Sequence, residues 1–313
     1  MRAKLDMFFV FIDLVVFAFF FLWQKTSNRK FLILCDTYGN IGNQLYLSCF
    51  LIKWSEEFNL LTFNFGLIRN QHYFVKAKED LLLRYPASKS FHAKNLQLQL
   101  AACMHRISLR LLKLKEAQGI QSIDLLEIKS ESDFASLEAK IERNGLTFLR
   151  GFIHNKPYSI FRNHLPKIRE YFEIAKSYDA QVMEPIEHLK CCDLIIGVAI
   201  RHGDYKTWQN GKFFLPTETY QKWMEEIEEL FASSKVGFFI ASDEEQDLTT
   251  FKKHTFFFRA GHPLSNLYSL SKCDFLVSVP SSFAGWAHFI GEVPYLAIDK
   301  KVRKVTAHDF KSW

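Results

Sequence analysis

The second half of the chain alternates apolar runs of strand length with segments of helical character, and this alternation constrains the fold more than any other feature. Most connections between them are short, which favours a parallel sheet with helices on both faces. The strands of such a sheet are covered on both sides and read as continuous apolar runs. We therefore predict strands near 194–200, 236–241, 255–258, 274–279 and 294–298, and helices near 217–233, 244–252, 264–271 and 283–290.

The first half of the chain predicts a second α/β domain. A strand at 31–35, a turn at 37–43 and a helix at 44–58 are followed by strands at 60–65 and 146–153, with 67–90 irregular between them. A basic amphipathic helix is expected at 96–115, and helices broken near Pro185 at 164–189. A length of 313 residues suits two domains of about 100–200 residues each. We place these domains at 29–165 and 166–313.

An almost wholly apolar stretch at 7–23, with basic residues on both flanks, precedes these domains. It predicts that 1–28 forms an uncleaved, single-pass membrane anchor, of the Golgi type in a eukaryote or in the inner membrane of a bacterium. A removable signal sequence is one alternative. Another is a buried N-terminal helix of a soluble protein, because the stretch is short and contains Asp13.

Composition excludes several classes of protein. With 48% hydrophobic residues and a net charge of +6, the chain is neither disordered nor basic enough to indicate a nucleic-acid partner. The mild positive charge suits an anionic small ligand or a membrane surface. The six cysteines show no spacing typical of a metal site, so we expect reduced thiols and no metal.

Charged residues follow the strand at 194–200 directly. Arg201 is expected at its carboxyl end, where open α/β sheets bind ligands, and a guanidinium there can fork onto a diphosphate. The alternative is that Asp204 pairs with Arg201 and leaves neither for a ligand. His202 adds a third titratable group.

Two further strand ends carry polar turns in the same half of the chain. Ser281, Ser282 and Phe283 open a predicted helix, where a hydroxyl and free N–H groups can hold a phosphate or serve only as a cap. Asp243, at the end of 236–241, is placed to meet a ribose or base, or to cap the next helix. In the first half, Gly39, Gly42 and Asn43 form a turn that can cradle an anion, although Asn43 can equally cap the helix.

Five segments, in order, resemble motifs of the α-1,2-fucosyltransferase-like glycosyltransferases and their α-1,6 and protein-O-fucosyltransferase relatives. The G-x-x-G-N-Q turn is similar to residues 39–44, and the H-x-R-R-G-D-Y signature to 199–205. The G-[YF]-x-Q segment resembles 151–154, S-D-D resembles 242–244, and S-x-F-S-x-W resembles 281–286.

The resemblance implies a GT-B architecture, with two Rossmann-like domains and parallel sheets facing a cleft. It implies an inverting, metal-independent transfer of L-fucose from GDP-fucose to a glycan acceptor. The N-terminal domain would then hold the acceptor and the C-terminal domain the nucleotide sugar. By matched position, Arg201 would neutralise the β-phosphate of the leaving GDP, and the Ser281 turn would cradle the diphosphate.

The sequence departs from the family pattern at three positions. Ala199 stands where the family has histidine, His202 where it has a second arginine, and His154 where it has glutamine. These changes leave open a transferase that uses another nucleotide sugar, or a non-catalytic relative that binds a nucleotide or glycan. No family residue identifies the general base, and Asp36, His154 and His202 are the candidates.

Overall fold

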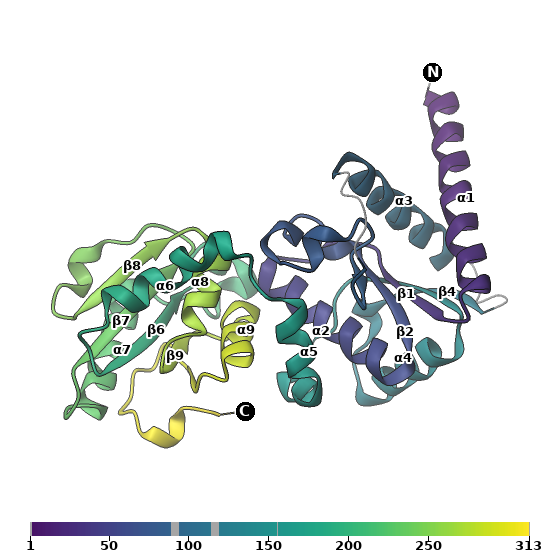
Figure 1. Cartoon of the computed structure of the whole chain (residues 1–313). Coiled ribbons are helices and arrows are strands. Elements are labelled where there is room, and N and C mark those ends of the chain that lie inside the picture. The colour runs from purple at the N-terminus through teal and green to yellow at the C-terminus, as the bar shows by residue number, and fades with distance from the viewer. Residues whose placement is uncertain (1, 89–93, 114–118, 155, 313) are drawn as a thin grey trace. The chain divides into compact units, whose positions relative to one another are not determined.

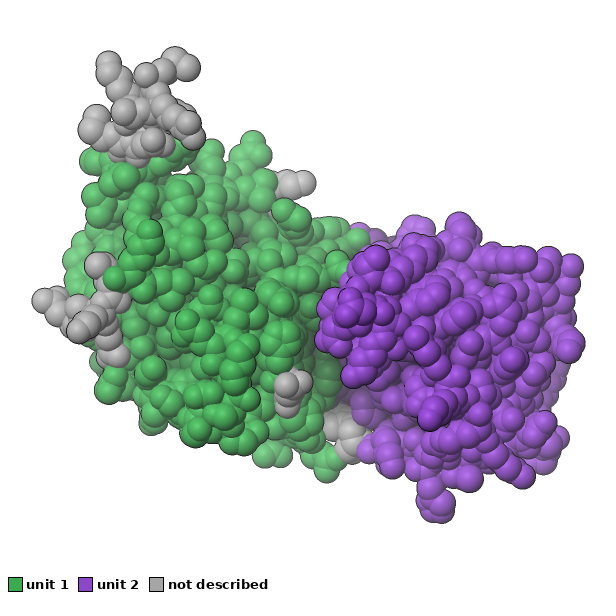
Figure 2. Space-filling view, turned by 180° about the vertical axis from the view of Figure 1, so that it is seen from behind, with its two compact units in different colours: residues 1–175 green, residues 176–313 purple. Residues whose placement is uncertain are grey.

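The computed structural model describes the chain except for residues 1, 89–93, 114–118, 155 and 313. The described chain divides into two compact units, Met1–Ala175 and Lys176–Trp313, coloured separately in Figure 2. Each unit is built around its own five-stranded sheet.

Unit 2 contains a wholly parallel sheet in the order β10-β9-β6-β7-β8. Its central strand is the apolar run after Asp193, which pairs with β7 on one side and β9 on the other. The strands are β6 (Leu194–Ile200), β7 (Val236–Ser242), β8 (Phe256–Ala260), β9 (Phe275–Ser278) and β10 (Tyr295–Ala297). The α-helices of this unit are α6 (Asp179–His188), α7 (Thr217–Leu230), α8 (Pro263–Leu270) and α9 (Ser282–Gly291).

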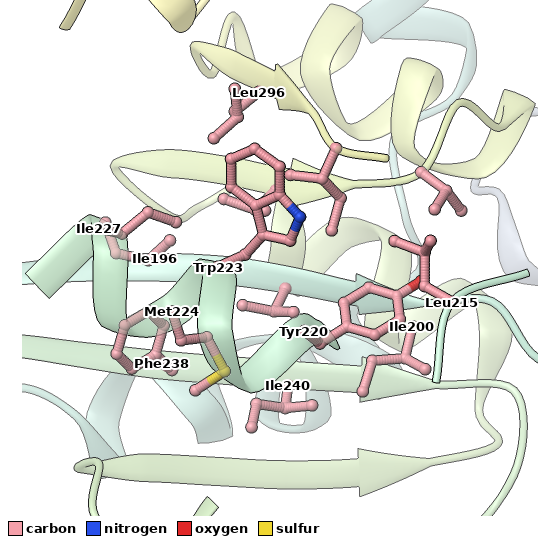
Figure 3. Close-up of a cluster of buried hydrophobic side chains, with 14 of the residues drawn as sticks. Ile196, Ile200, Leu215, Tyr220, Trp223, Met224, Ile227, Phe238, Ile240 and Leu296 are labelled. Atoms are coloured by element: carbon pink, nitrogen blue, oxygen red, sulfur yellow. The ribbon is translucent and has the colours of Figure 1, made fainter. Parts of the chain in front are cut away.

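Helices cover both faces of the unit 2 sheet, as the sequence predicted. On one face, Tyr220, Trp223 and Ile227 of α7 pack against alternate residues of β6 and β7 (Figure 3). On the other face, small residues of α9 such as Ala284 and Ala287 pack against Ala199 and its neighbours. Each fully buried large apolar side chain contributes about 1.5–3 kcal/mol, so these two clusters fix the central strand firmly between the helices.

Unit 1 contains a mixed sheet in the order β3-β2-β1-β5-β4, parallel except for the β2–β3 pair. Figure 1 shows α1 and α3 on one side of this sheet and α2 and α4 on the other. The strands are β1 (Lys30–Leu34), β2 (Leu60–Asn64), β3 (Arg84–Tyr85), β4 (Ile120–Asp124) and β5 (Leu146–Arg150). The α-helices are α1 (Arg2–Thr26), α2 (Ile41–Phe58), α3 (Lys94–Leu112), α4 (Glu131–Arg143) and α5 (Leu165–Tyr171).

Several elements differ from the sequence-based expectation. Neither β4 nor α4 was predicted, and the helix expected at 244–252 is only a short 3-10 turn, Leu248–Phe251. The helix expected at 96–115 ends at Leu112 in the structure, and 114–115 lie outside the described residues. The irregular segment at 67–90 consists of short 3-10 turns and β3 in its described part. All six cysteines are free thiols, of which Cys191 is exposed and Cys192 half-buried.

The N-terminal helix α1 packs one face against unit 1. Phe20 is buried against Phe63 of β2, with ring centres 5.2 Å apart, and Trp23 lies 5.0 Å from Phe31 of β1. Within the described residues, 9–26 is the single helical stretch long and apolar enough to cross a membrane, with a mean hydropathy of 1.7. Length and composition therefore permit a membrane span, while the packing makes α1 part of the unit 1 core.

Candidate functional site

Arg201 follows β6 directly, and its guanidinium lies between two carboxylates. Nη2 is 3.0 Å from Oδ1 of Asp204, and Nη1 is 3.3 Å from Oδ2 of Asp243. The buried Nε has no hydrogen-bond partner among the described residues. Since the Asp204 side chain is 57% exposed and Arg201 only 14%, their ion pair contributes little to stability. Arg201 can therefore exchange Asp204 for another anion.

Asp243, at the end of β7, organises the turn that carries Arg201. Its Oδ1 accepts hydrogen bonds from the backbone N–H groups of His202, at 2.9 Å, and Gly203, at 3.4 Å. A Cβ at Gly203 would lie only 3.2 Å from Oδ2 of Asp243, so glycine permits this close approach. The 3-10 turn that follows, Leu248–Phe251, is capped by Asp247, so the alternative that Asp243 caps the next helix is wrong.

The serine turn after β9 lies beside the Arg201 turn. β6 and β9 are parallel neighbours, so their carboxyl ends share one edge of the sheet. Tyr205 connects the two turns, because its ring packs against the guanidinium of Arg201, 5.1 Å away, and its hydroxyl donates to the carbonyl of Pro280 at 3.0 Å. This role of Tyr205 was not predicted, although its place in the 199–205 segment was the available signal.

Ser281 acts as the N-cap of α9, since its Oγ accepts a hydrogen bond from the N–H of Ala284 at 3.0 Å. Ser282 and Phe283 are half-buried at the first turn of this helix. The first N–H groups of a helix and the positive end of its dipole attract anions. The cap and the anion-binding geometry are thus compatible at this turn.

His202 is buried beneath the Arg201 turn with both ring nitrogens in hydrogen bonds. Nε2 lies 2.7 Å from the carbonyl of Leu215, and Nδ1 lies 3.2 Å from Nε2 of Gln246. The carbonyl oxygen of Leu215 can only accept a hydrogen bond, so Nε2 donates to it, and the amide nitrogen of Gln246 donates to Nδ1. These partners fit the neutral tautomer with the proton on Nε2. This arrangement favours a structural role over that of a base or a second cation.

The turn at the start of α2 occupies the corresponding edge of unit 1. Gly39 has φ +60°, and a Cβ there would lie 2.1 Å from Nδ2 of Asn43. Asn40 occupies the N-cap position without a side-chain hydrogen bond, and Asn43 is the third residue of the helix, so the expectation that Asn43 caps it is wrong. Gly42 is buried within the same first turn.

Asp36 and His154 lie at the neighbouring ends of β1 and β5. Asp36 accepts a hydrogen bond from the N–H of Gly151 at 3.2 Å, and burial raises the pKa of its carboxyl. His154 packs against the ring of Phe152, 5.0 Å away, which in turn stacks on Tyr38. Burial, with the charge of Lys129, lowers the pKa of His154. Both groups have environments that suit proton transfer.

The candidate residues therefore form two sets, one in each unit. Arg201, Asp204, Asp243 and the Ser281–Phe283 turn share the carboxyl edge of the unit 2 sheet, whereas Gly39, Gly42, Asn43, Asp36 and His154 lie at that of the unit 1 sheet. Within the described parts of the chain, no group of three or more His, Cys, Asp or Glu side chains could hold a metal ion.

No protein-family model matches the chain, and no curated protein matches it either. Solved structures do share its fold. A mutant of Arabidopsis thaliana FUT1 in complex with GDP has a TM-score of 0.57 at 11% identity, over 87% of this chain and 72% of that chain. NodZ α-1,6-fucosyltransferase soaked with GDP-fucose has a TM-score of 0.51 at 12% identity, over 87% of this chain and 96% of that chain. Fucosyltransferase NodZ from Bradyrhizobium has a TM-score of 0.50 at 14% identity, over 86% of this chain and 95% of that chain.

These likenesses define the fold class. The chain is an α/β protein with two largely parallel sheets, the GT-B-like architecture of solved fucosyltransferases. The fold class predicted from the sequence is confirmed. A shared fold does not determine an activity, because activity depends on the residues of the site.

Proposed function

We propose that the protein is a glycosyltransferase that transfers L-fucose from GDP-fucose to a glycan acceptor, with inversion and without a metal ion. The observation that carries the proposal is the adjacency of Arg201 and the Ser281 turn, joined through Tyr205 at one sheet edge. A guanidinium and a helix N-terminus together suit the two phosphates of a nucleotide sugar. The fold shared with a GDP-bound FUT1 mutant supports the same reading.

Arg201 is the proposed catalytic residue, because the departing GDP gains negative charge in the transition state. When a donor binds, its diphosphate would replace the exposed Asp204 carboxylate on Nη2 of Arg201. Asp243 would stay in place and hold the turn, since its hydrogen bonds come from backbone N–H groups. The unpartnered Nε offers a further donor.

Inversion requires a base that takes the proton of the acceptor hydroxyl as its oxygen attacks the anomeric carbon and the bond to GDP breaks. Asp36 and His154 of unit 1 are the proposed bases. A lowered pKa keeps the His154 imidazole neutral and able to accept a proton at pH 7, and a raised pKa makes Asp36 a stronger base than an ordinary carboxylate. His202 is the weakest candidate, because its ring nitrogens are already occupied.

The donor-binding role thus falls to unit 2 and the acceptor-binding role to unit 1. The turn of Gly39, Gly42 and Asn43 belongs to unit 1, and we assign it to the donor only on its resemblance to the family motif. Membrane attachment through α1, the helix apolar enough for it, would place the enzyme beside membrane-bound glycans. The α-1,2 linkage rests on the same resemblance.

One observation favours a second candidate, a relative that binds a nucleotide without turnover or uses another nucleotide sugar. The position where the family has a second arginine holds the buried His202. Without that cation, stabilisation of the leaving group depends on Arg201 and the helix N-terminus alone.

The test is incubation of the full-length chain with GDP-fucose, GDP-mannose and UDP-sugars while release of the nucleoside diphosphate is measured. GDP release from GDP-fucose alone would support the proposal. Release from a different donor would support another transferase, and binding of GDP without release would support the non-catalytic relative.

A further inference from the structure

Exposed apolar side chains gather on two helices of unit 1. Ten of the thirteen large hydrophobic side chains that are exposed in the described chain belong to α1 and α3, and the other three are Met183, Trp208 and Leu248 of unit 2. On α1 the most exposed are Phe11, at 66%, and Leu22, at 61%. On α3 they are Leu96, Leu98 and Leu109. Patches of this kind mark surfaces that are covered in the functional state.

Between Phe9 and Trp23, the helix α1 is apolar around its circumference except at Asp13. Phe17 and Phe20 face the sheet, with the ring of Phe17 6.4 Å from Phe148 of β5. Leu14, Val15 and Leu22 face outwards. A helix that is apolar on all sides is normally surrounded by protein or by lipid. Protein covers the inner face of α1, and the described chain provides no cover for the outer face.

An ion-pair cluster holds α1 on unit 1. The side chain of Asp13 is 1% exposed and lies 2.6 Å from Nη2 of Arg106 and 2.6 Å from Nη1 of Arg110, both on α3. A second bond from Nε of Arg106, at 2.9 Å, makes this contact bidentate. Leaving a charge at the centre of a bilayer costs about 2.5–3.5 kcal/mol on insertion scales, so Asp13 gains from staying with its two arginines.

Packing and charge together disfavour a helix that crosses the membrane. The stretch that would span, 9–26, is the same stretch that covers Phe31, Phe63 and Phe148 and that neutralises Asp13. Surrounding it with lipid would uncover the sheet of unit 1 and separate Asp13 from α3. Lying flat on a membrane requires neither change, because only the outer face meets lipid.

We propose that unit 1 binds a membrane in plane, with the outer faces of α1 and α3 in the lipid interface and anionic headgroups around their basic residues. Lys25, Arg29, Arg110 and Lys113 are exposed. The α3 helix contains neither Asp nor Glu. Its Arg106 and Arg110 share the single carboxylate of Asp13, so an excess positive charge remains that complements anionic lipid. This inference concerns attachment alone and does not depend on transferase activity.

The binding test is flotation of the purified full-length chain with vesicles of phosphatidylcholine, with and without phosphatidylglycerol. We expect the chain to float with the vesicles, more so with the anionic lipid. The double variant Phe11→Glu with Leu22→Glu should lower the bound fraction about tenfold or more, because it removes two large exposed apolar side chains that would be buried in the lipid. Met183→Glu with Leu248→Glu, the matched change in unit 2, should bind as the wild type does. Equal binding of both variants would overturn the proposal.

The orientation test uses sealed membrane vesicles from producing cells, with one epitope tag before Met1 and another after Trp313. In-plane attachment predicts that a protease cuts both tags from the same side. Tags on opposite sides would show a spanning helix, and loss of the N-terminal tag from the mature protein would show a removed signal sequence. A third result would be that the wild type does not float and forms a dimer without lipid, whereas the Phe11→Glu, Leu22→Glu variant is a monomer. That result would assign the apolar face to a second copy of the chain. Each of these three results contradicts the proposal.

Discussion

The carboxyl edges of the two sheets are built alike, each with an arginine beside an aspartate, and differ in the groups around that pair. In unit 2 the edge presents a guanidinium supported by Asp204 and Asp243, next to the N-terminus of α9. In unit 1 it presents the Asp36 carboxylate, 3.8 Å from Nη2 of Arg150, and the His154 imidazole, which packs against the ring of Phe152. A cationic edge suits a leaving phosphate, and an aromatic edge with a base suits a sugar hydroxyl.

This difference arises from the few residues that follow each central strand. The strands β1 and β6 are both buried apolar runs between parallel neighbours. Asp36 follows β1 after Cys35, whereas Arg201 follows β6 at once. The same scaffold therefore permits different chemistry in each unit, as is general for ligand sites at the ends of parallel strands.

The largest effect is expected for the base in unit 1. Replacing the true base should lower kcat by about 10²–10⁴-fold, whereas replacing the other candidate should cost less than tenfold. Asp36→Asn and His154→Gln should be compared in steady-state transfer assays with circular dichroism as the control for folding. If both variants keep full activity, the proposed chemistry of the unit 1 edge is wrong.

The unit 2 edge should respond to loss of its cation. Arg201→Ala should lower transfer by about 10²–10³-fold, the range for removal of one group that stabilises developing charge. Arg201→Lys should retain part of the transfer activity, because an ammonium keeps the positive charge but cannot make the two parallel hydrogen bonds of a guanidinium. Arg303→Ala breaks an exposed pair with Asp309 elsewhere in unit 2 and serves as the control, with activity unchanged.

The glycine turns of the two units allow a matched stability comparison. Gly39→Ala and Gly261→Ala both place a side chain at positive φ, +60° and +68° respectively, which costs about 1–2 kcal/mol. At Gly39 the new Cβ also meets Asn43, whereas at Gly261 nothing lies within 4 Å. Urea unfolding should show a greater loss for Gly39→Ala. An equal loss would mean that the Asn43 side chain moves away at no cost.

The smallest expected effect is a pH-dependent gain in stability at Asp36. Burial raises the pKa of this carboxyl in the folded protein above its ordinary value of 3.8. The carboxyl of Asp36 then adds to the free energy of unfolding below pH 3.8, and this contribution is lost as pH rises through the folded-state pKa. Asp36→Asn should therefore be more stable than the wild type at neutral pH, and the gain should shrink as pH falls towards 3.8. A gain that grows at low pH would contradict the assigned cause.

Much of unit 2 could be predicted from the sequence, because its inner strands β6, β7 and β9 are mostly buried and its strands read as apolar runs. β6 was predicted with its observed bounds, and α7 and α9 to within a few residues. In unit 1, β4 was missed because this edge strand, IQSID, is mostly polar and lacks the apolar run that marks β8, FFFRA, an edge strand of unit 2. α4 was missed even though Ser130 and Asp133 form a capping box and Phe134, Leu137 and Ile141 follow at helical spacing.

The sites divide in the same way. Residues at strand ends were predictable, because strand order alone brings them to one edge. Contacts between distant segments were not. The Tyr205 to Pro280 hydrogen bond joins residues 75 apart, and the Asp13 to Arg106 pair joins residues 93 apart. Neither spacing has a periodic signature, so each required the folded chain.

The central claim is that Arg201 binds a nucleoside diphosphate. It is tested most directly by thermal unfolding of the full-length wild type and of Arg201→Ala, each with and without GDP. Saturating GDP should stabilise the wild type and the Arg303→Ala control, by about 2.7 kcal/mol at a hundredfold excess over Kd, and should leave Arg201→Ala at its unliganded Tm. Equal stabilisation of Arg201→Ala, or no response of the wild type, would contradict the assignment of the unit 2 edge to a nucleoside diphosphate.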